Sequence, residues 1–186
     1  MSKQQHAPGE LELVRAFVNT VDIEEGTEEL ISGDAVAEWL SEHGLASPGL
    51  RATQADLARA IELREALRAT LLAHNDRDAT ADEAYTTLDD VARRAKLRLT
   101  FGQGGDAKLV PEADGVDGSL GRLVAIVHDA IARGTWERLK ACREHSCEWA
   151  FYDHTKNRSG AWCNMAVCGN RAKARAYRER RAVSGA

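Results

Sequence analysis

Residues Leu139–Arg181 read LKACREHSCEWAFYDHTKNRSGAWCNMAVCGNRAKARAYRERR, and this stretch holds all four cysteines of the 186-residue chain. The cysteines form two pairs, Cys142/Cys147 and Cys163/Cys168, each with four residues between its members. Two short-spaced pairs on two loops supply the four thiolates of a tetrahedral zinc site. The sequence therefore predicts one structural zinc ion per chain, bound by these four residues.

Disulfide bonds and unrelated buried thiols are the two other interpretations of the cysteines. The N-terminal sequence MSKQQHAPGE has no apolar segment behind its lysine. We therefore expect no secretory signal and a reducing cytosol, where stable disulfides are rare. Unrelated thiols would have no reason to fall into equally spaced pairs. His145 and His154 lie between the pairs as alternative ligands, but four cysteines already fill a tetrahedral shell.

A small hairpin is predicted between the two cysteine pairs. Residues 148–153 are rich in aromatic side chains and read as a strand, residues 157–160 as a turn, and Ala161–Trp162 as the returning strand. Such a core is too small to fold alone, so we expect the metal to supply much of the folding free energy.

An arginine-rich helix is expected near residues 168–181, directly after the second pair. Arg171, Arg175 and Arg178 share one face of it. Such a stripe gives salt-dependent affinity for nucleic acid, and arginine also recognises the guanine edge. Lys173 and Arg158 complete the expected DNA contacts. The alternative is a basic surface that only confers solubility.

The motif residues of the finger resemble the CGNR zinc-finger family of bacterial transcription regulators. The resemblance rests on Trp162-Cys163, Met165, Cys168-Gly169-Asn170-Arg171 and Lys173. In that family the finger follows a helical domain called ABATE, and residues 17–20 are similar to the opening of that domain. The resemblance implies a DNA-binding regulator.

Two details qualify this resemblance. We expect Gly169, Asn170 and Trp162 to be structural residues of the finger, because a small residue suits a tight turn after a ligand. Family members usually carry basic residues just before the Trp-Cys pair, whereas this chain has Ser159-Gly160-Ala161. A phosphate contact at those positions would be missing or reduced here.

The region before the finger is expected to be mainly α-helical, with one small β-hairpin. Apolar residues at helical spacing predict helices over residues 10–22, 32–43, 53–74, 80–91 and 120–133, with a loop at 115–118. Capping patterns at Ser32 or Asp34, Thr53-x-x-Asp56 and Thr80-x-x-Glu83 mark three helix starts. Alternating apolar residues on either side of a glycine-rich turn predict the hairpin, over residues 97–111.

Two groups of polar residues in this region have alternative interpretations. Asn19, Thr20 and Asp22 either line an internal pocket or form local hydrogen bonds at a helix end, and we favour the local bonds. The charged residues of the third helix are expected to form its solvated face. They are Arg59, Glu62, Arg64, Glu65 and Arg68.

The net charge of −4 conceals an uneven distribution. Residues 139–186 carry ten basic and four acidic side chains, whereas residues 1–138 carry fifteen basic and twenty-five acidic ones. A negatively charged partner is therefore expected at the C-terminal end alone. We expect a disordered tail over residues 1–9, a helical domain over 10–138, of which residues 10–133 fold without the finger, and the finger with its helix over 139–182.

The favoured function is zinc-dependent, DNA-binding transcriptional regulation in the bacterial cytoplasm, at the nucleoid. The helical domain would sense a small-molecule effector or form a homodimer. A protein-interaction adaptor and a thiol-based redox sensor are the alternatives. No enzymatic activity is expected, because four cysteines leave no open position on the metal. No apolar run is long enough to cross a membrane.

Overall fold

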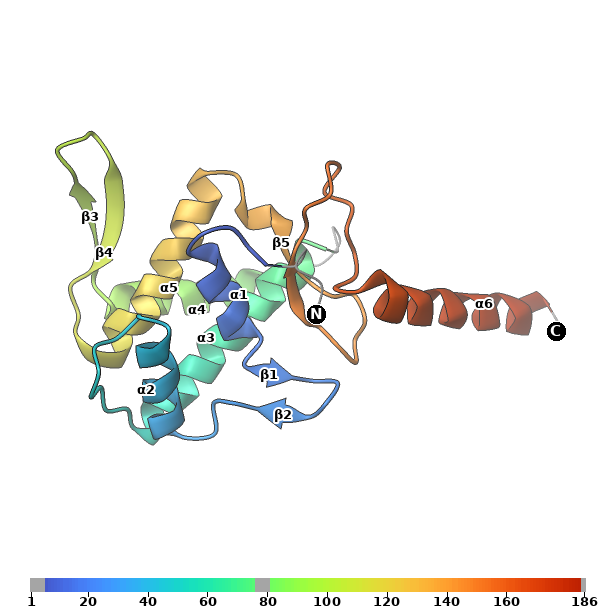
Figure 1. Cartoon of the computed structure of the whole chain (residues 1–186), viewed down its shortest axis with the longest axis horizontal. Coiled ribbons are helices and arrows are strands. Elements are labelled where there is room, and N and C mark those ends of the chain that lie inside the picture. Colours follow the sequence, from blue (N-terminus) through green and yellow to red (C-terminus); the bar gives the residue numbers. More distant parts are fainter. Residues whose placement is uncertain (1–5, 76–80, 185–186) are drawn as a thin grey trace.

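The computed structural model describes residues 6–75 and 81–184. A helical body occupies most of the molecule, and the last helix projects from one end of it (Figure 1). The β3–β4 hairpin lies at the opposite end of the body. No helix in the described residues is both long and apolar enough to cross a membrane.

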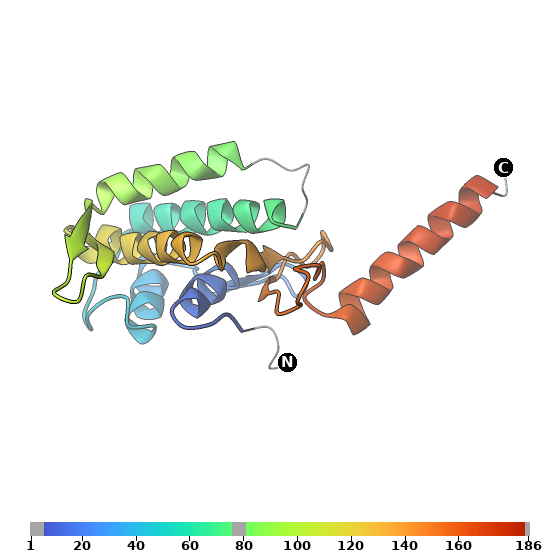
Figure 2. The same cartoon turned by 90° about the horizontal axis from the view of Figure 1, so that it is seen from above.

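The body is built from five helices around one apolar core. They are α1 (Leu11–Val18), α2 (Gly33–Glu42), α3 (Gln54–Ala73), α4 (Asp82–Arg94) and α5 (Gly115–Ala132). The longest of them, α3, packs against α1, α2, α4 and α5 (Figure 2). Its residues Leu63, Leu67 and Leu71 are fully buried, as the predicted apolar periodicity requires.

The predicted capping patterns fix two of the helix starts. The Ser32 hydroxyl accepts a hydrogen bond from the backbone N–H of Ala35 at the start of α2. Thr53 and Asp56 form a reciprocal capping box at the start of α3. Thr80, expected to cap the fourth helix, lies outside the described residues.

The loop predicted at residues 115–118 is wrong, because α5 begins at Gly115. Glycines allow this part of the helix to approach its neighbours closely. A Cβ at Gly118 would lie 2.0 Å from the Ala113 carbonyl oxygen, and one at Gly121 would lie 2.2 Å from the Ala95 Cβ. Of the two glycines that bound the predicted loop, Gly118 is therefore a close-contact position of a buried helix.

Three two-stranded antiparallel sheets accompany the helices in the described residues. They are β1 (Val21–Asp22) with β2 (Thr27–Glu28), β3 (Leu97–Phe101) with β4 (Ala107–Pro111), and β5 (Leu139–Ala141) with β6 (Ala150–Tyr152). The β3–β4 hairpin is the predicted one. The returning strand predicted at Ala161–Trp162 is wrong, because β6 pairs with β5 instead. The hairpin therefore encloses the first cysteine pair rather than separating the two pairs.

The expectation of a solvated charged face on α3 is wrong for two of its arginines. The Arg64 and Arg68 side chains are only 4% and 3% exposed. Arg64 pairs with Glu28 at 2.6 Å. Arg68 donates to the Val18 carbonyl oxygen at 2.6 Å. Both guanidinium groups are buried because they satisfy acceptors on segments packed across α3.

The residues after α1 form hydrogen bonds rather than lining a pocket. Thr20 donates to the Phe17 carbonyl oxygen at 2.9 Å, and Asp22 accepts from the backbone N–H groups of Glu24 and Glu25. These are the local bonds that we favoured. Asn19 differs, because its amide reaches Ala150 in β6, 131 positions away.

The N-terminal tail is more ordered than expected over its last residues. Ala7 is 7% exposed and belongs to the core, and its backbone N–H donates to Glu12. Residues 1–5, the rest of the predicted disordered tail, lie outside the described residues.

A single core extends across the expected boundary between body and finger. After α5, a short 3₁₀ turn (η2, Trp136–Arg138) leads into β5, which packs against α3. Leu139, Ala141, Ala150 and Tyr152 are buried in the same cluster as the helices. This arrangement argues against a body that folds without the finger.

We expect a chain that ends at Gly134 to lose most of its stability. Burying a leucine or a large aromatic side chain contributes roughly 1.5–3 kcal/mol each, and this chain lacks Leu139 and Tyr152 with their strands. Thermal unfolding followed by circular dichroism should show a broad transition with a low midpoint temperature. A chain ending at Asn170, which keeps both strands and all four cysteines, is the control and should unfold like the full chain. Equal, sharp transitions for both would contradict the shared core.

Candidate metal centre and basic helix

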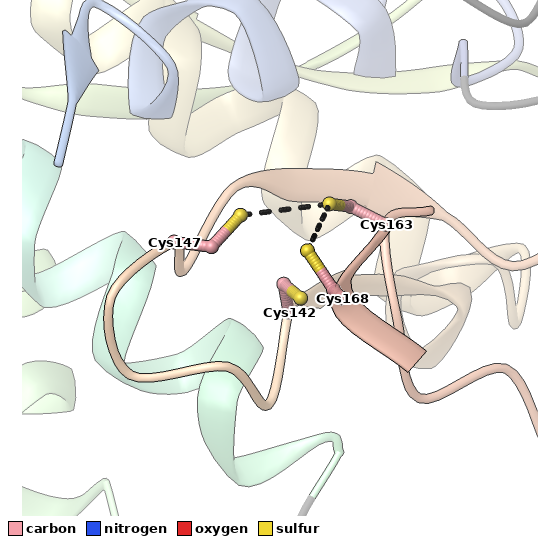
Figure 3. A group of neighbouring side chains, drawn as sticks. All are labelled: Cys142, Cys147, Cys163 and Cys168. Atoms are coloured by element: carbon pink, nitrogen blue, oxygen red, sulfur yellow. Dashed lines mark hydrogen bonds between the residues drawn. The ribbon is translucent and has the colours of Figure 1, made fainter. Parts of the chain in front are cut away.

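The four cysteine sulfurs converge on one point (Figure 3). All four lie within 4.8 Å of one another. The Cys147–Cys163 and Cys163–Cys168 sulfur pairs are 3.5 and 3.7 Å apart. A tetrahedral zinc site with Zn–S bonds of ~2.3 Å places its sulfurs ~3.8 Å apart, whereas a disulfide requires ~2.05 Å. The sulfurs are therefore spaced for a shared cation and not for disulfide bonds.

Backbone pairing positions the first pair of cysteines. The β5–β6 ladder continues past Ala141 with a hydrogen bond from the Cys142 N–H to the Trp149 carbonyl oxygen, at 3.0 Å. The chain then closes a tight loop, in which the Cys147 N–H donates to the Glu144 carbonyl oxygen at 2.8 Å. This loop, residues 142–147, is the first knuckle.

A capped π-helical turn (η3, Met165–Gly169) positions the second pair. The Asn164 side chain accepts from the N–H groups of Ala166 and Val167, and Cys168 lies inside the turn. Gly169 lets the Met165 side chain and the Trp162 ring pack closely on the turn, since a Cβ would lie 2.4 Å from the Met165 sulfur and 3.2 Å from the Trp162 ring. Asn170 donates to the Ala166 carbonyl oxygen at 3.0 Å. Gly169 and Asn170 thus hold the turn that carries a ligand, which is the role expected of them.

The electrostatics of the thiol cluster favour a bound cation. Hydrogen bonds from the Cys147 and Cys163 thiols lower the pKa of Cys142. The same contacts with Cys142 raise the pKa of Cys147 and Cys163. Four thiolates at this spacing repel one another, so full ionisation requires a cation among them.

The histidines considered as alternative ligands lie outside this group. Within the described residues, the cluster that could hold a metal consists of the four cysteines. The His154 ring instead donates to the His6 carbonyl oxygen at 3.0 Å, and His145 is exposed. Trp162 packs against the cysteine cluster. The metal ligands are therefore four sulfur atoms, and an aromatic side chain packs against them.

Polar side chains of the body bind the backbone next to the cysteines. Asn75 donates to the carbonyl oxygens of Ala141 and Ala161, at 2.8 and 3.0 Å. The first of these precedes Cys142 directly, and the second lies two positions before Cys163. Asn75 is 6% exposed. Its single amide group therefore ties together the two chain segments that enter the metal site.

Two further body residues bind the finger in the same way. Arg68 donates to the Glu148 carbonyl oxygen at 3.0 Å, just after Cys147. The Asn19 amide exchanges two hydrogen bonds with the backbone of Ala150, at 2.9 and 2.7 Å. We call Asn19, Arg68 and Asn75 the body clamp. Sequence patterns miss it, because each side chain serves a backbone group that is distant in the sequence.

A buried ion pair fastens the loop before the second cysteine pair. The Lys140 ammonium, on β5, donates to Asp153 at 2.8 Å and to the Arg158 and Gly160 carbonyl oxygens. A Cβ at Gly160 would lie 2.8 Å from the Asp153 carboxyl group. This close approach explains why position 160 requires a residue without a side chain. Arg158, in the same loop, pairs with Glu137 at 2.9 Å.

The basic helix α6 (Asn170–Ser184) follows the π-helical turn without a break and leads away from the body (Figure 1). Arg171, Arg175 and Arg178 line one groove of about 300 Å³, with Glu144 of the first knuckle as its acidic wall. Arg175 pairs with Glu144, and Arg171 pairs with Glu24 of the β1–β2 turn at 2.6 Å. Lys173 is exposed. Arg171 and Arg175 therefore have acidic partners within the molecule as well as a place on the basic face.

We expect Asn75→Ala to weaken zinc binding without removing a ligand. The change frees the two carbonyl groups that the Asn75 amide holds, so the cysteines beside them are less ordered before zinc binds. Zinc binding must then order them, which makes the binding free energy less favourable. An effect of about tenfold matches outer contacts of other metal sites. Competition with a chromophoric chelator measures it. Asn157→Ala, in an exposed turn, is the control and should bind zinc like the wild type. An unchanged affinity in Asn75→Ala would contradict the role of the body clamp.

The Lys140–Asp153 pair predicts a loss of stability in acid. Burial raises the pKa of Asp153, but hydrogen bonds from Lys140, Thr155 and Gly160 outweigh it and lower the pKa to about 2. An unfolded aspartate titrates near ~3.9. The ionised Asp153 carboxylate therefore makes its full contribution to the free energy of unfolding above about pH 4 and loses it toward pH 2. Asp153→Asn should therefore be less stable than the wild type at pH 7, by roughly 1–2 kcal/mol. In urea titrations the difference in unfolding free energy between the wild type and Asp153→Asn should disappear toward pH 2. A difference that does not change with pH would refute the stabilising role of the Lys140–Asp153 pair.

Comparisons with known protein families agree with this geometry. The model of the CGNR zinc finger matches residues 138–181. The model of the ABATE family, described as "Putative stress-induced transcription regulator", matches residues 11–135. A search of curated proteins found no match to the chain. The four thiolates are therefore a structural zinc site, and the chain belongs to the ABATE family and carries a C-terminal CGNR zinc finger.

Proposed function

We propose that this protein is a transcription regulator that binds DNA through α6 and the zinc finger. The observation that carries the proposal is the groove beside α6, where three arginines converge next to a metal-anchored turn. Guanidinium groups release counterions when they neutralise phosphates, and they also recognise guanine edges. Figure 2 shows α6 projecting from the body, and Arg171, Arg175 and Arg178 are exposed to solvent.

The helical body supplies the regulatory part of the proposal. Its excess of acidic residues disfavours contact with DNA, so the body is assigned to a homodimer contact or to a small-molecule effector. A cavity of about 400 Å³ between the α2–α3 connection and the start of α5 offers room for an effector. Such a regulator works in the cytoplasm, at the nucleoid.

The metal shell supports a role in which the zinc itself takes no part in catalysis. Four protein ligands leave no position for a reactive water, so the zinc is assigned to structure alone. A protein-interaction adaptor would use the same arginines against an acidic protein surface. A redox sensor would release zinc under mild oxidant through the same thiols. Both alternatives predict no steep dependence of DNA affinity on salt.

We expect the protein to retard random genomic DNA fragments, with an affinity that falls steeply as salt rises. Replacing an arginine that contacts phosphate should lower the salt slope by about one unit and weaken all sequences alike. Replacing one that reads a base should cost roughly 1–3 kcal/mol on a preferred site. Titration of Arg171→Ala, Arg175→Ala and Arg178→Ala at several salt concentrations distinguishes these cases.

Arg133→Ala provides the control, because it removes an exposed arginine of the body. It should leave both affinity and slope unchanged. Preferred sites for these titrations come from sequencing the genomic DNA that co-purifies with the protein. If all three α6 variants keep bound zinc and show unchanged DNA affinity and salt slope, DNA binding through α6 is refuted and the adaptor is favoured.

A further inference from the structure

The direction of α6 depends on few contacts with the rest of the molecule. The helix packs chiefly against η3, the turn that precedes it, and then extends into solvent (Figures 1 and 2). Two ion pairs tie its first turns to other segments, Arg171 with Glu24 and Arg175 with Glu144. The two acidic partners differ in origin, because Glu144 belongs to the finger and Glu24 to the body.

Glu144 lies in the finger itself, between the first two zinc ligands, so its pair with Arg175 stays within the finger and its helix. Its side chain is 5% exposed within the first knuckle, four positions or fewer from two zinc ligands. Glu24 lies on the β1–β2 turn, with a side chain that is 33% exposed. The Glu24–Arg171 pair thus connects the helical body with the basic helix.

The turn that carries Glu24 is closed by its own hydrogen bonds, and the base of its hairpin is anchored to the body. Asp22 accepts hydrogen bonds from the N–H groups of Glu24 and Glu25, at 3.0 and 3.1 Å. At the other end of the hairpin, Glu28 pairs with the buried Arg64 of α3. A chain of polar contacts therefore runs from α3 through the β1–β2 hairpin to Arg171.

The Glu24 carboxylate meets Arg171 as a phosphate oxygen would. One carboxylate oxygen lies 2.6 Å from a terminal nitrogen of the guanidinium, a charge-assisted hydrogen bond. Both side chains are partly exposed, so a solvent-borne anion has access to the pair. A DNA phosphate that approaches the groove at Arg171 must displace this carboxylate or share the guanidinium with it.

We propose that Glu24 is an internal competitor of DNA: the acidic β1–β2 turn of the body occupies a phosphate position on α6 and holds the helix back from the duplex. This inference rests on the proposed DNA binding. It also gives the body a physical route to regulate the finger, because any change that moves the β1–β2 turn alters the availability of Arg171.

The test is a double-mutant cycle on a labelled random-sequence duplex. Glu24→Gln should bind the duplex about two- to fivefold more tightly than the wild type, the range that a partly exposed ion pair allows. In the Arg171→Ala background the same change should have no effect, because the guanidinium that it liberates is absent. Zinc content and thermal unfolding of each variant confirm an intact finger.

Glu25→Gln is the matched control. It removes the same charge from the adjacent position, so it reproduces any effect of net charge alone. Three outcomes would overturn the proposal that Glu24 competes with DNA. They are an equal gain in duplex affinity in Glu25→Gln, no gain or a loss of affinity in Glu24→Gln, and a gain that persists in the Arg171→Ala background. A wild-type protein that binds no duplex even at low salt would instead refute the proposed function, and the inference with it.

Discussion

Four sulfur atoms must lie ~3.8 Å apart around one zinc ion, and that requirement organises residues 139–184, from β5 to the end of α6. It joins the loop between β5 and β6 to a π-helical turn more than fifteen residues further along the chain. The turn in turn begins α6, so the metal sets the place from which the basic helix projects. Without the cation, clustered thiolates repel one another, and the first knuckle and the π-helical turn are no longer joined.

The finger does not depend on the metal alone. Asn19, Arg68 and Asn75 satisfy backbone carbonyl and N–H groups beside the cysteines, and the apolar side chains of β5 and β6 lie in the core of the body. Buried backbone groups require such partners, since an unpaired one costs about as much as a lost hydrogen bond. The zinc site is consequently built on a body surface that already holds part of its backbone in place.

The basic helix has a different physical character from the five helices of the body. Among the side chains of α6 that the structure describes, no apolar stripe is buried, and an isolated helix of about 15 residues is only marginally stable in water. Its start is secured by Asn164, Gly169 and Asn170. Ion pairs hold its first turns. A helix of this kind gains most from an anionic surface that neutralises its arginines.

The sequence by itself determined the features that depend on local pattern. Two equal C-x4-C spacings identify the zinc ligands, Thr53 with Asp56 marks the start of α3, and alternating apolar residues identify the β3–β4 hairpin. Each of these relies on residues within a few positions of one another, where spacing dictates geometry. The expectation that α6 begins just after Cys168 belongs to the same class.

Tertiary structure decided what depends on distant partners. Arg64 and Arg68 match a solvated helix face in the sequence, yet they are buried because acceptors from α1, the β1–β2 hairpin and Glu148, just after the first knuckle, surround them. Gly118 suggests a loop until the Ala113 carbonyl oxygen is seen against it. The pairing of β6 with β5, and of Glu24 with Arg171, joins segments whose separation in sequence carries no periodic signal. Only the folded chain brings their donors and acceptors within hydrogen-bonding distance.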